Sequence, residues 1–436
     1  MLEKIFKLSV HGTTVKKELL AGLITFLTMS YILMVNPIIL GETGMDKAAL
    51  FTSTALVAMI ATLLMAFLAN IPVAQAPGMG MNTFFASTVV MTMGYSWQFA
   101  LTAVFIEGII FILLTCFNIR EILVRKIPQT LKNAIPAGIG LFIAFIGLQQ
   151  AGIVVANPHT MVTLGDWTNN GIWVALFGLI TIGALLARNI PGAILIGILS
   201  STVLALVLGV THLPEGAIVS VPPSIAPIFA QFEWTQVFSF DMLIVVFTFL
   251  MVNLFDTIGT LVGVASKAGL MDKKGNFPQV KKALFADALG TTIGSVMGNS
   301  VVTSYVESAS GVAAGGRTGL TAVSTALMFM IALFLSPIFL IVPVQATAPA
   351  LIIVGLFMLS SVLNINFSDY TESIPAYLTI IVMPFTYSIA EGIIFGILGF
   401  VFIKFLTGKV KDISIPIYLI ALLFFIKIII DVVIRV

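Results

Sequence analysis

Two carboxylates, Asp256 and Glu307, lie in or beside stretches of chain that are apolar enough to be membrane interior. An acidic side chain at the centre of a bilayer costs about 3 kcal/mol on insertion scales. Its presence there needs a reason, and the usual reason is a pathway for a substrate or an ion. Between the two acids lies a segment rich in Gly, Thr and Ser, which is poorly suited to regular helix.

Asp256 belongs to a polar stripe on the long apolar segment 247–264. Asn253, Asp256, Thr257 and Thr260 follow one another at i, i+3, i+4 and i+7, so a helix would carry all four on one face. A polar face within a membrane turns toward the interior of a helix bundle. Hydrogen bonding between helices is the alternative to a ligand site here.

An interrupted helix is predicted at QAPGMGMNTFFA, residues 75–86. Pro77, Gly78 and Gly80 disfavour regular helix, and broken backbone at membrane depth is tolerated where protein or a water-filled cavity covers it. The half-helix that follows would direct its amide donors toward the midplane, with Asn82 and Thr83 near that end. Close helix packing by the small residues is the alternative explanation.

A second interruption is predicted within residues 290–319, where the centre VVTSYVES favours extended or irregular backbone. Glu307 lies in it, and a salt bridge from Glu307 to Arg317 is the alternative to a ligand-binding role. Aromatic side chains that could stack on a planar ligand are Tyr31, Phe84, Phe85, Phe255 and Tyr305. The remaining membrane acids, predicted to cap helices or tie them together, are Glu107, Asp287 and Glu391.

Composition places these segments in an integral membrane protein. The chain is 59% hydrophobic and 9% charged with a mean hydropathy of +1.13, whereas soluble domains are roughly 45–50% apolar and about 25% charged. The runs do not alternate in polarity as barrel strands do, so the prediction is an all-α polytopic fold. One cysteine, Cys116, and three histidines in loops or the lead-in give no sign of a metal site, and no cofactor is indicated.

Fourteen spans are predicted, each with an error of a few residues: 17–41, 49–70, 77–93, 97–117, 131–151, 171–188, 190–210, 237–262, 281–298, 301–314, 317–340, 345–364, 371–388 and 389–407. Residues 415–436 either span or lie along the interface, because Lys427, Asp431 and Arg435 interrupt them. With the N-terminus inside, the basic residues fall on the cytoplasmic side: Lys16, Lys17, Arg120, Arg125, Lys126, Lys132, Arg188, Lys267, Lys273, Lys274, Lys281, Lys282, Arg317, Lys404, Lys409 and Lys411. The predicted location is the cell membrane.

A weak internal repeat relates the two halves. Thr-Phe-Leu recurs at residues 25–27 and 248–250, about 220 residues apart, and the same offset carries APGMGMN onto NSVVTSY. Seven predicted spans separate the copies, and an odd number inverts the second copy relative to the first, an arrangement common in secondary transporters.

At these motifs the chain resembles the AzgA-like purine permeases, a branch of the nucleobase cation symporter family. The motifs are VNP (35–37), APGMGMN with Asn82, FDTIGTL with Asp256, FADALGTTIG with Asp287, and TSYVESASGVAAGGRTGLTA with Glu307. The resemblance implies a 7+7 inverted repeat with broken spans three and ten. It also implies a lead-in at 1–16, a core domain at 17–120 and 237–342, and a gate domain at 121–236 and 343–436.

The resemblance further implies proton-coupled import of guanine and hypoxanthine, or of adenine, by an elevator motion. Carried over by motif, the purine would contact Asn82, Thr83, Phe84, Asp256, Tyr305 and Glu307, with Asn253, Thr257 and Thr303 in support. Asp256 and Glu307 are the candidates for proton coupling. Relatives carry two acids three apart on span eight, whereas Asn253 holds the first position here. The QH signature of the uracil and xanthine branch is absent.

A channel and a membrane enzyme are the alternatives to a carrier. A channel also uses polar stripes, but channels line continuous pores with rings from several subunits, whereas these acids converge on one point. A membrane enzyme is disfavoured because no Cys/His cluster, Ser/His pairing or phosphate-binding loop is present. The expected partners are a purine, a proton and lipid, with no nucleic acid, and with a homodimer as one option.

Overall fold

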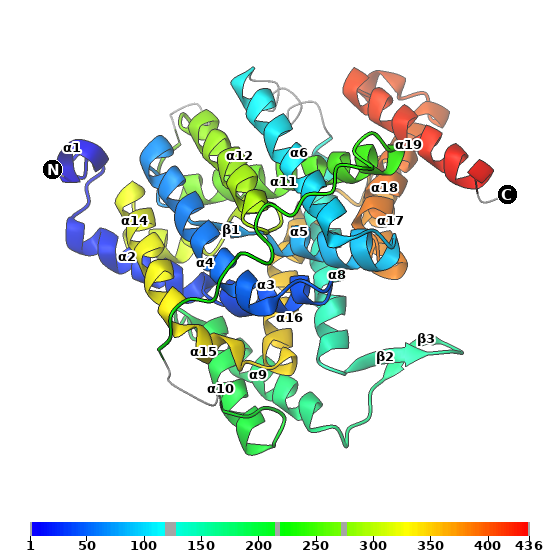
Figure 1. The fold of residues 1–436 in the computed structure, drawn as a ribbon. Helices are drawn as coiled ribbons and strands as arrows, with labels where there is room; N and C mark the ends of the chain where they lie inside the picture. Colours follow the sequence, from blue (N-terminus) through cyan, green and yellow to red (C-terminus); the bar gives the residue numbers. More distant parts are fainter. Residues whose placement is uncertain (1, 118–127, 214–218, 272–276, 435–436) are drawn as a thin grey trace. The chain divides into compact units, whose positions relative to one another are not determined.

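Helices dominate the described chain, as the apolar runs predict. The computed structural model describes residues 2–117, 128–213, 219–271 and 277–434 (Figure 1). By its internal packing the chain divides into two units. The first comprises Met1–Cys116 and Ile146–Ile352, and the second comprises Phe117–Phe145 and Ile353–Val436.

The first unit contains both predicted interruptions. Its helices are α1 (Leu2–Phe6), α2 (Val15–Met29), α3 (Ile32–Gly41), α4 (Lys47–Leu64), α5 (Met79–Thr83), α6 (Trp97–Cys116), α9 (Asn170–Ala187), α10 (Ala193–Val207), α11 (Phe240–Lys267), α12 (Val280–Val296), α13 (Ser308–Ala313), α14 (Gly319–Ala332) and α15 (Ser336–Leu340). The π-helical turns η1 (Met65–Ala69) and η2 (Phe84–Thr92) continue α4 and α5, and the 3-10 turn η3 (Leu333–Leu335) joins α14 to α15. The strands are β1 (Gln75–Pro77), β2 (Val154–Asn157), β3 (Met161–Leu164) and β4 (Val302–Ser304).

Two helices, α8 (Gln129–Gln150) and α16 (Val344–Leu359), contain residues of both units. The second unit continues with η4 (Ser360–Asn364), α17 (Tyr370–Thr386), α18 (Ile389–Leu406), η5 (Val410–Asp412) and α19 (Ile415–Ile434). Helices α17 and α18 pack closely because small residues line their contact. A Cβ added at Gly396 would lie 1.8 Å from the Thr379 hydroxyl oxygen.

The predicted spans correspond to the observed helices. Each of the fourteen overlaps at least one helix, and β1 and β4 lie at the starts of the interrupted spans three and ten. In the first span a two-residue turn at Ser30 and Tyr31, with helical backbone angles, separates α2 from α3, which local sequence does not predict. Within the described residues, eight helices are long and apolar enough to cross a membrane. Several basic residues of the predicted inside loops lie outside the described residues: Arg120, Arg125, Lys126, Lys273 and Lys274.

The C-terminal segment forms the helix α19, which packs against α18. The rings of Phe402 and Phe425 lie 6.2 Å apart between these two helices. The side chains of Lys427 and Asp431, and all of Arg435, lie outside the described residues.

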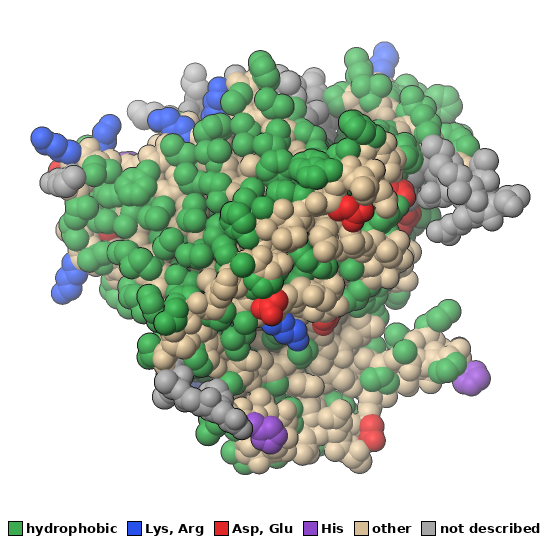
Figure 2. All heavy atoms as spheres, viewed as in Figure 1, with side chains coloured by type: hydrophobic (Ala, Val, Ile, Leu, Met, Phe, Trp, Pro, Cys, Tyr) green, Lys and Arg blue, Asp and Glu red, His purple; other side chains and the backbone are tan. Residues whose placement is uncertain are grey.

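Large apolar side chains cover much of the visible surface, and charged side chains are sparse on it (Figure 2). In the first unit Phe67 is 59% exposed, Ile180 70% and Val203 60%. Monomeric soluble proteins rarely expose contiguous apolar patches of this kind. Lipid tails solvate such side chains at no cost, so the surface agrees with a membrane-embedded chain.

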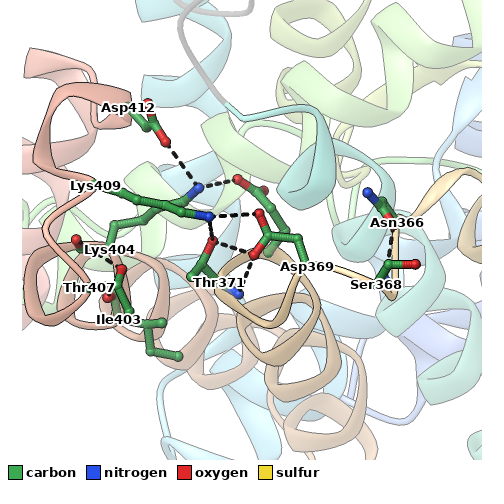
Figure 3. A network of polar contacts seen from close by, with 10 residues as sticks. Asn366, Ser368, Asp369, Thr371, Ile403, Lys404, Thr407, Lys409 and Asp412 are labelled. Atoms are coloured by element: carbon green, nitrogen blue, oxygen red, sulfur yellow. Dashed lines mark hydrogen bonds and ion pairs between the residues drawn. The ribbon is translucent and has the colours of Figure 1, made fainter.

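A polar cluster joins α17, α18 and η5 in the second unit (Figure 3). Lys404 is buried, and its Nζ lies 2.7 Å from Glu372 Oε1 and 3.4 Å from Asp412 Oδ2. Lys409 Nζ lies 3.0 Å from Asp369 Oδ2. Asp369 also caps α17, because its Oδ1 accepts from the Thr371 N–H at 2.9 Å.

The capping carboxylate predicts a pH dependence of stability. Hydrogen bonds from Thr371 and Lys409 lower the pKa of Asp369 to about 2, whereas an unfolded Asp titrates near about 3.9. A lowered folded pKa stabilises the fold above about pH 4 and loses that effect as the pH falls toward about 2. Asp369→Asn keeps a capping side chain and loses the charge, so its unfolding temperature should fall below that of the wild type at neutral pH and converge on it in acid.

Asp369→Ala is the matched comparison, because it removes the cap as well as the charge. Its apparent unfolding temperature in detergent should stay below that of the wild type at every pH. Equal behaviour of the two variants across the acid range would contradict the assigned role of the charge.

Candidate functional site

The two predicted interruptions meet as a short antiparallel ladder between β1 and β4. The opposed residues are Gln75 with Ser304, Ala76 with Thr303 and Pro77 with Val302. The Gly78 N–H extends the ladder by donating to Val301 O at 2.9 Å, and the Tyr305 N–H donates to Ala74 O at 3.0 Å. The ladder therefore satisfies backbone groups that a broken helix would leave without partners in a membrane.

Two threonine hydroxyls support this ladder in equivalent ways. Thr62 Oγ1, on α4, accepts from the Gln75 N–H at 3.0 Å and donates to Gln75 O at 3.1 Å. Thr291 Oγ1, on α12, accepts from the Val302 N–H at 3.2 Å and donates to Val302 O at 3.1 Å. In each half of the chain, the helix before the strand supplies one hydroxyl that serves both backbone groups of one strand residue.

Glu307 lies where β4 gives way to α13, as the residue before the first helical turn. Its side chain is partly exposed, whereas residues 301–305 and 308 around it are all buried. The Tyr31 hydroxyl donates to Glu307 Oε1 at 2.6 Å. Tyr31 is buried and lies at the turn between α2 and α3, so this unpredicted turn brings a donor to the acid.

Asp256 lies on α11 and is also partly exposed. Its carboxylate is within hydrogen-bonding reach of the Thr303 hydroxyl on β4, and it is close enough to Glu307 and Asp287 for their charges to interact. The two predicted acids are thus brought to the same ladder. Arg317 is not the partner of Glu307, because its guanidinium donates to Val312 O at 2.6 Å and to Gly316 O at 2.7 Å.

Asn82 and Thr83 lie on α5, directly after β1, and both are buried. The Ser300 hydroxyl donates to Asn82 Oδ1. Asn82 Nδ2 has no hydrogen-bond partner among the described residues, and neither does Gln75 Oε1. A buried amide donor without a partner costs about 1–3 kcal/mol, so a ligand acceptor at Asn82 would recover that energy.

The predicted aromatic residues divide between ladder support and packing. The Tyr305 hydroxyl donates to Pro77 O at 2.6 Å, which ties β4 to β1. Phe84 is buried and meets Phe249 edge-on, with ring centroids 4.8 Å apart. The Phe255 side chain lies outside the described residues.

The predicted supporting residues Asn253 and Thr257 enter a separate buried network. Asn253 Nδ2 donates to Glu107 Oε1 on α6 at 2.9 Å, and Thr257 Oγ1 lies 2.8 Å from Asn253 Oδ1. Thr257 Oγ1 also lies 3.0 Å from Asp287 Oδ1 on α12, and Gln75 Nε2 donates to that same oxygen at 3.1 Å. Glu107 and Asp287 therefore tie helices together, as predicted for them, and this network reaches β1 through Gln75.

Asn36, from the VNP motif, connects the first span to α4 and to the loop before β4. Asn36 Nδ2 donates to Thr54 Oγ1 at 2.6 Å and to Asn299 Oδ1 at 2.7 Å, and all three side chains are buried. Asn299 lies in the loop before β4. The VNP motif is evident in the sequence, but no local signal marks this role of Asn36 or the roles of Gln75 and Ser300.

The chemistry available at the ladder is hydrogen bonding and proton transfer. It combines two partly exposed carboxylates, a buried amide donor and a tyrosine hydroxyl. Among the described residues, no group of three His, Cys, Asp or Glu side chains could hold a metal ion.

Comparison with known sequences identifies the family. The model described as Permease family matches residues 16–395. The chain belongs to this family. The adenine permease AdeP of Escherichia coli is 46% identical over 98% of this chain and 96% of its own length. The guanine/hypoxanthine permease PbuO of Bacillus subtilis is 43% identical over 97% of this chain and 99% of its own length. These relatives confirm the resemblance to the purine permease branch, so the chain is a permease and not an enzyme.

The fold is shared with solved transporters. The transmembrane domain of the cyanobacterial bicarbonate transporter BicA superposes with a TM-score of 0.65 over 86% of this chain and 97% of that chain, at 15% identity. The permease therefore has the 7+7 inverted-repeat fold with core and gate domains, and it is a multi-pass membrane protein. Each half of this fold supplies one of the two strands β1 and β4.

Close packing between α2 and α13 positions Tyr31 beside Glu307 and predicts a sensitive glycine. A Cβ at Gly311 would lie 2.1 Å from Thr25 Oγ1 and 2.6 Å from Ala21 O. Overpacking of this kind costs about 1–3 kcal/mol, so Gly311→Ala should lower the apparent unfolding temperature in detergent. Gly263→Ala on α11 is the control, because no atom lies within 4 Å of its added Cβ. An unchanged unfolding temperature for Gly311→Ala would contradict the close contact.

Proposed function

We propose that this permease imports purine nucleobases, with hypoxanthine and guanine as the main substrates, by symport with a proton. The support is the agreement between the family and the site. Relatives of 43–46% identity over nearly the full chain are named as adenine and guanine/hypoxanthine permeases. The observation that carries the proposal is the meeting of Glu307 and Asp256, both partly exposed, at a ladder whose other residues are buried.

The polar groups at the ladder complement the edges of a purine. Hypoxanthine and guanine present N1–H, and guanine adds an exocyclic amine, so a carboxylate such as Glu307 can accept from one edge. Their ring nitrogens and O6 are acceptors, which suit the Asn82 amide donor. Tyr305 and Phe84 lie beside these groups and would bound a flat ring. Thr83 and Thr303 complete the proposed contacts, with Asn253 and Thr257 supporting from the adjoining network.

Proton coupling follows from the cost of moving charge through a membrane. A carboxylate in a low-dielectric region is far more costly than the neutral acid. Asp256 or Glu307 would take a proton on the outside, and the loaded site would cross with the purine and release both inside. A charged acid would not carry purine across, so the site would cross inward only when it is protonated and loaded. It would then return empty and deprotonated, with water in place of purine around the carboxylate, so that one proton enters with each purine.

The moving part is proposed to be the core domain, residues 17–120 and 237–342, sliding relative to a gate domain, residues 121–236 and 343–436. In this elevator scheme the ladder travels with the core and carries the bound purine. The N-terminal lead, residues 1–16, is placed in the cytoplasm, and the protein in the cell membrane. A homodimer is compatible with this arrangement and is not required by it.

Removal of either acid tests the proposal directly. In a host deficient in purine transport, Glu307→Gln and Asp256→Asn should each reduce accumulation of labelled hypoxanthine at least tenfold. A hydrogen bond to a charged group contributes about 1.5–3 kcal/mol, and each 1.4 kcal/mol is about tenfold in affinity. Asp166→Asn is the control, because Asp166 is exposed and lies in a loop. Normal accumulation by both site variants would remove these acids from the mechanism.

Adenine is a second candidate substrate, because a named adenine permease is 46% identical to this chain. Adenine presents an N1 acceptor beside its N6 amine, so it matches a protonated acid or an amide, which both donates and accepts. Hypoxanthine N1–H instead matches the carboxylate. If Glu307 hydrogen-bonds to the N1 edge of the purine, adenine should compete better against labelled hypoxanthine as the external pH is lowered.

Glu307→Gln supplies the matched variant, since its amide resembles the protonated acid at every pH. Because this variant is expected to accumulate little hypoxanthine, competition is measured as displacement of labelled hypoxanthine from the purified protein, and adenine should displace it well at every pH. If the ratio of adenine to hypoxanthine competition changed with pH in the variant as it does in the wild type, Glu307 would not be the group that hydrogen-bonds to the N1 edge.

A further inference from the structure

A chain of hydrogen bonds crosses three helices apart from the proposed purine contacts. It runs from Glu107 on α6 through Asn253 and Thr257 on α11 to Asp287 on α12. The three contacts measure 2.9, 2.8 and 3.0 Å, and all four side chains are 0% exposed. Both ends are carboxyl groups, and only an amide and a hydroxyl lie between them.

The number of hydrogen atoms in this chain is fixed by chemistry. Thr257 has a single hydroxyl hydrogen, but its oxygen contacts both Asn253 Oδ1 and Asp287 Oδ1. An amide oxygen cannot donate. Two separate two-centre hydrogen bonds at Thr257 therefore require Thr257 to donate to Asn253 and a protonated Asp287 to donate to Thr257.

Turning the amide over does not remove this requirement. The oxygen and nitrogen of an Asn side chain have nearly the same shape, so both orientations fit the same space. With its oxygen toward Glu107, Asn253 would donate to Thr257, and Thr257 could donate to an ionised Asp287. The contact with Glu107 would then need a proton on Glu107. In each orientation, at least one carboxyl group must be protonated.

We propose that Glu107, Asn253, Thr257 and Asp287 form a proton-binding site in which one proton is shared between the two end carboxyl groups. When the proton is on Asp287, the Asp287 O–H donates to Thr257 and Glu107 is ionised. When it is on Glu107, the Glu107 O–H donates to Asn253 and Asp287 is ionised. The arrangements differ by a half-turn of the Asn253 amide and a rotation of the Thr257 hydroxyl, and the charge of the site is −1 in both.

The surroundings connect this site to the ladder. Gln75, in β1, donates to Asp287 Oδ1 at 3.1 Å, and an Asp287 oxygen that bears a proton can still accept this bond. Asp256, on α11, is close enough to Asp287 and to Glu307 for their charges to interact. A proton on Asp287 removes one negative charge that acts on Asp256. The proton-binding site therefore influences the charge at the ladder, and the inference does not rest on the proposed function.

The test uses single amide substitutions at each end. In Asp287→Asn the new amide donates to Thr257, and its nitrogen cannot accept from Gln75 Nε2. The Gln75 amide must turn over so that its Oε1, which otherwise has no partner, accepts from this nitrogen. Every contact is then satisfied with Glu107 ionised. In Glu107→Gln the new amide donates to Asn253, which donates to Thr257, which donates to an ionised Asp287. Each substitution alone thus removes the need for a proton. Two independent buried acids would behave differently, because each substitution would then remove only its own proton.

The measurement is the infrared C=O absorption of protonated carboxyl groups in purified protein at neutral pH, without purine. It is made in the Asp256→Asn, Glu307→Gln background, which removes the ladder acids. The background should show the band of the shared acid, and adding either Asp287→Asn or Glu107→Gln should abolish it. Loss of the band with only one of the two, or with neither, overturns the proposal. Thr257→Ser in this background keeps the hydroxyl and should keep the band, and elution as a single folded species verifies each variant.

Discussion

The pairing of β1 with β4 is the constraint on which the rest of the site depends. Two spans are interrupted at membrane depth, and each interruption frees backbone donors and acceptors that lipid cannot satisfy. The strands satisfy each other, and Thr62 and Thr291 complete the arrangement from the preceding helices. An isolated broken span would leave these groups without partners. Each half of the inverted repeat therefore supplies hydrogen-bond partners for the backbone groups of the strand in the other half.

This pairing also decides where the side chains lie. Asn82 follows β1 and Glu307 follows β4, so the antiparallel register places them beyond opposite ends of the short ladder. Asn82 accordingly contacts Ser300, which precedes β4. Thr303 on β4 faces Asp256. A shift of one residue in the register would turn each strand side chain to the opposite face. The ladder thus acts as a positioning device, and the Tyr305 hydroxyl on Pro77 O holds its end together.

The sequence predicts the helices and both interruptions, because long apolar runs and the Pro77–Gly78–Gly80 cluster have direct local consequences. It also places Asn253, Asp256 and Thr257 on one helix face, and in the structure Asn253 and Thr257 are buried while Asp256 is partly exposed. What it could not predict is which neighbour each residue meets. Asn253 and Thr257 turn to Glu107 and Asp287, whereas Asp256 turns to β4. That division depends on how α6 and α12 flank α11, and spacing along a single helix contains no such information.

The turn between α2 and α3 likewise could not be predicted from local sequence. It matters because it positions Tyr31. No proline or glycine marks Ser30 and Tyr31, so local preferences gave no signal. The turn is supported by tertiary contacts: α13 lies against α2 because Gly311 has no side chain, and the Thr28 hydroxyl contacts Glu307 O at 3.5 Å. Tyr31 then reaches the Glu307 carboxylate. The first and tenth spans therefore meet at Glu307. A change in the charge of Glu307 would alter its hydrogen bond with Tyr31, so the state of this acid is linked to the packing between the two spans.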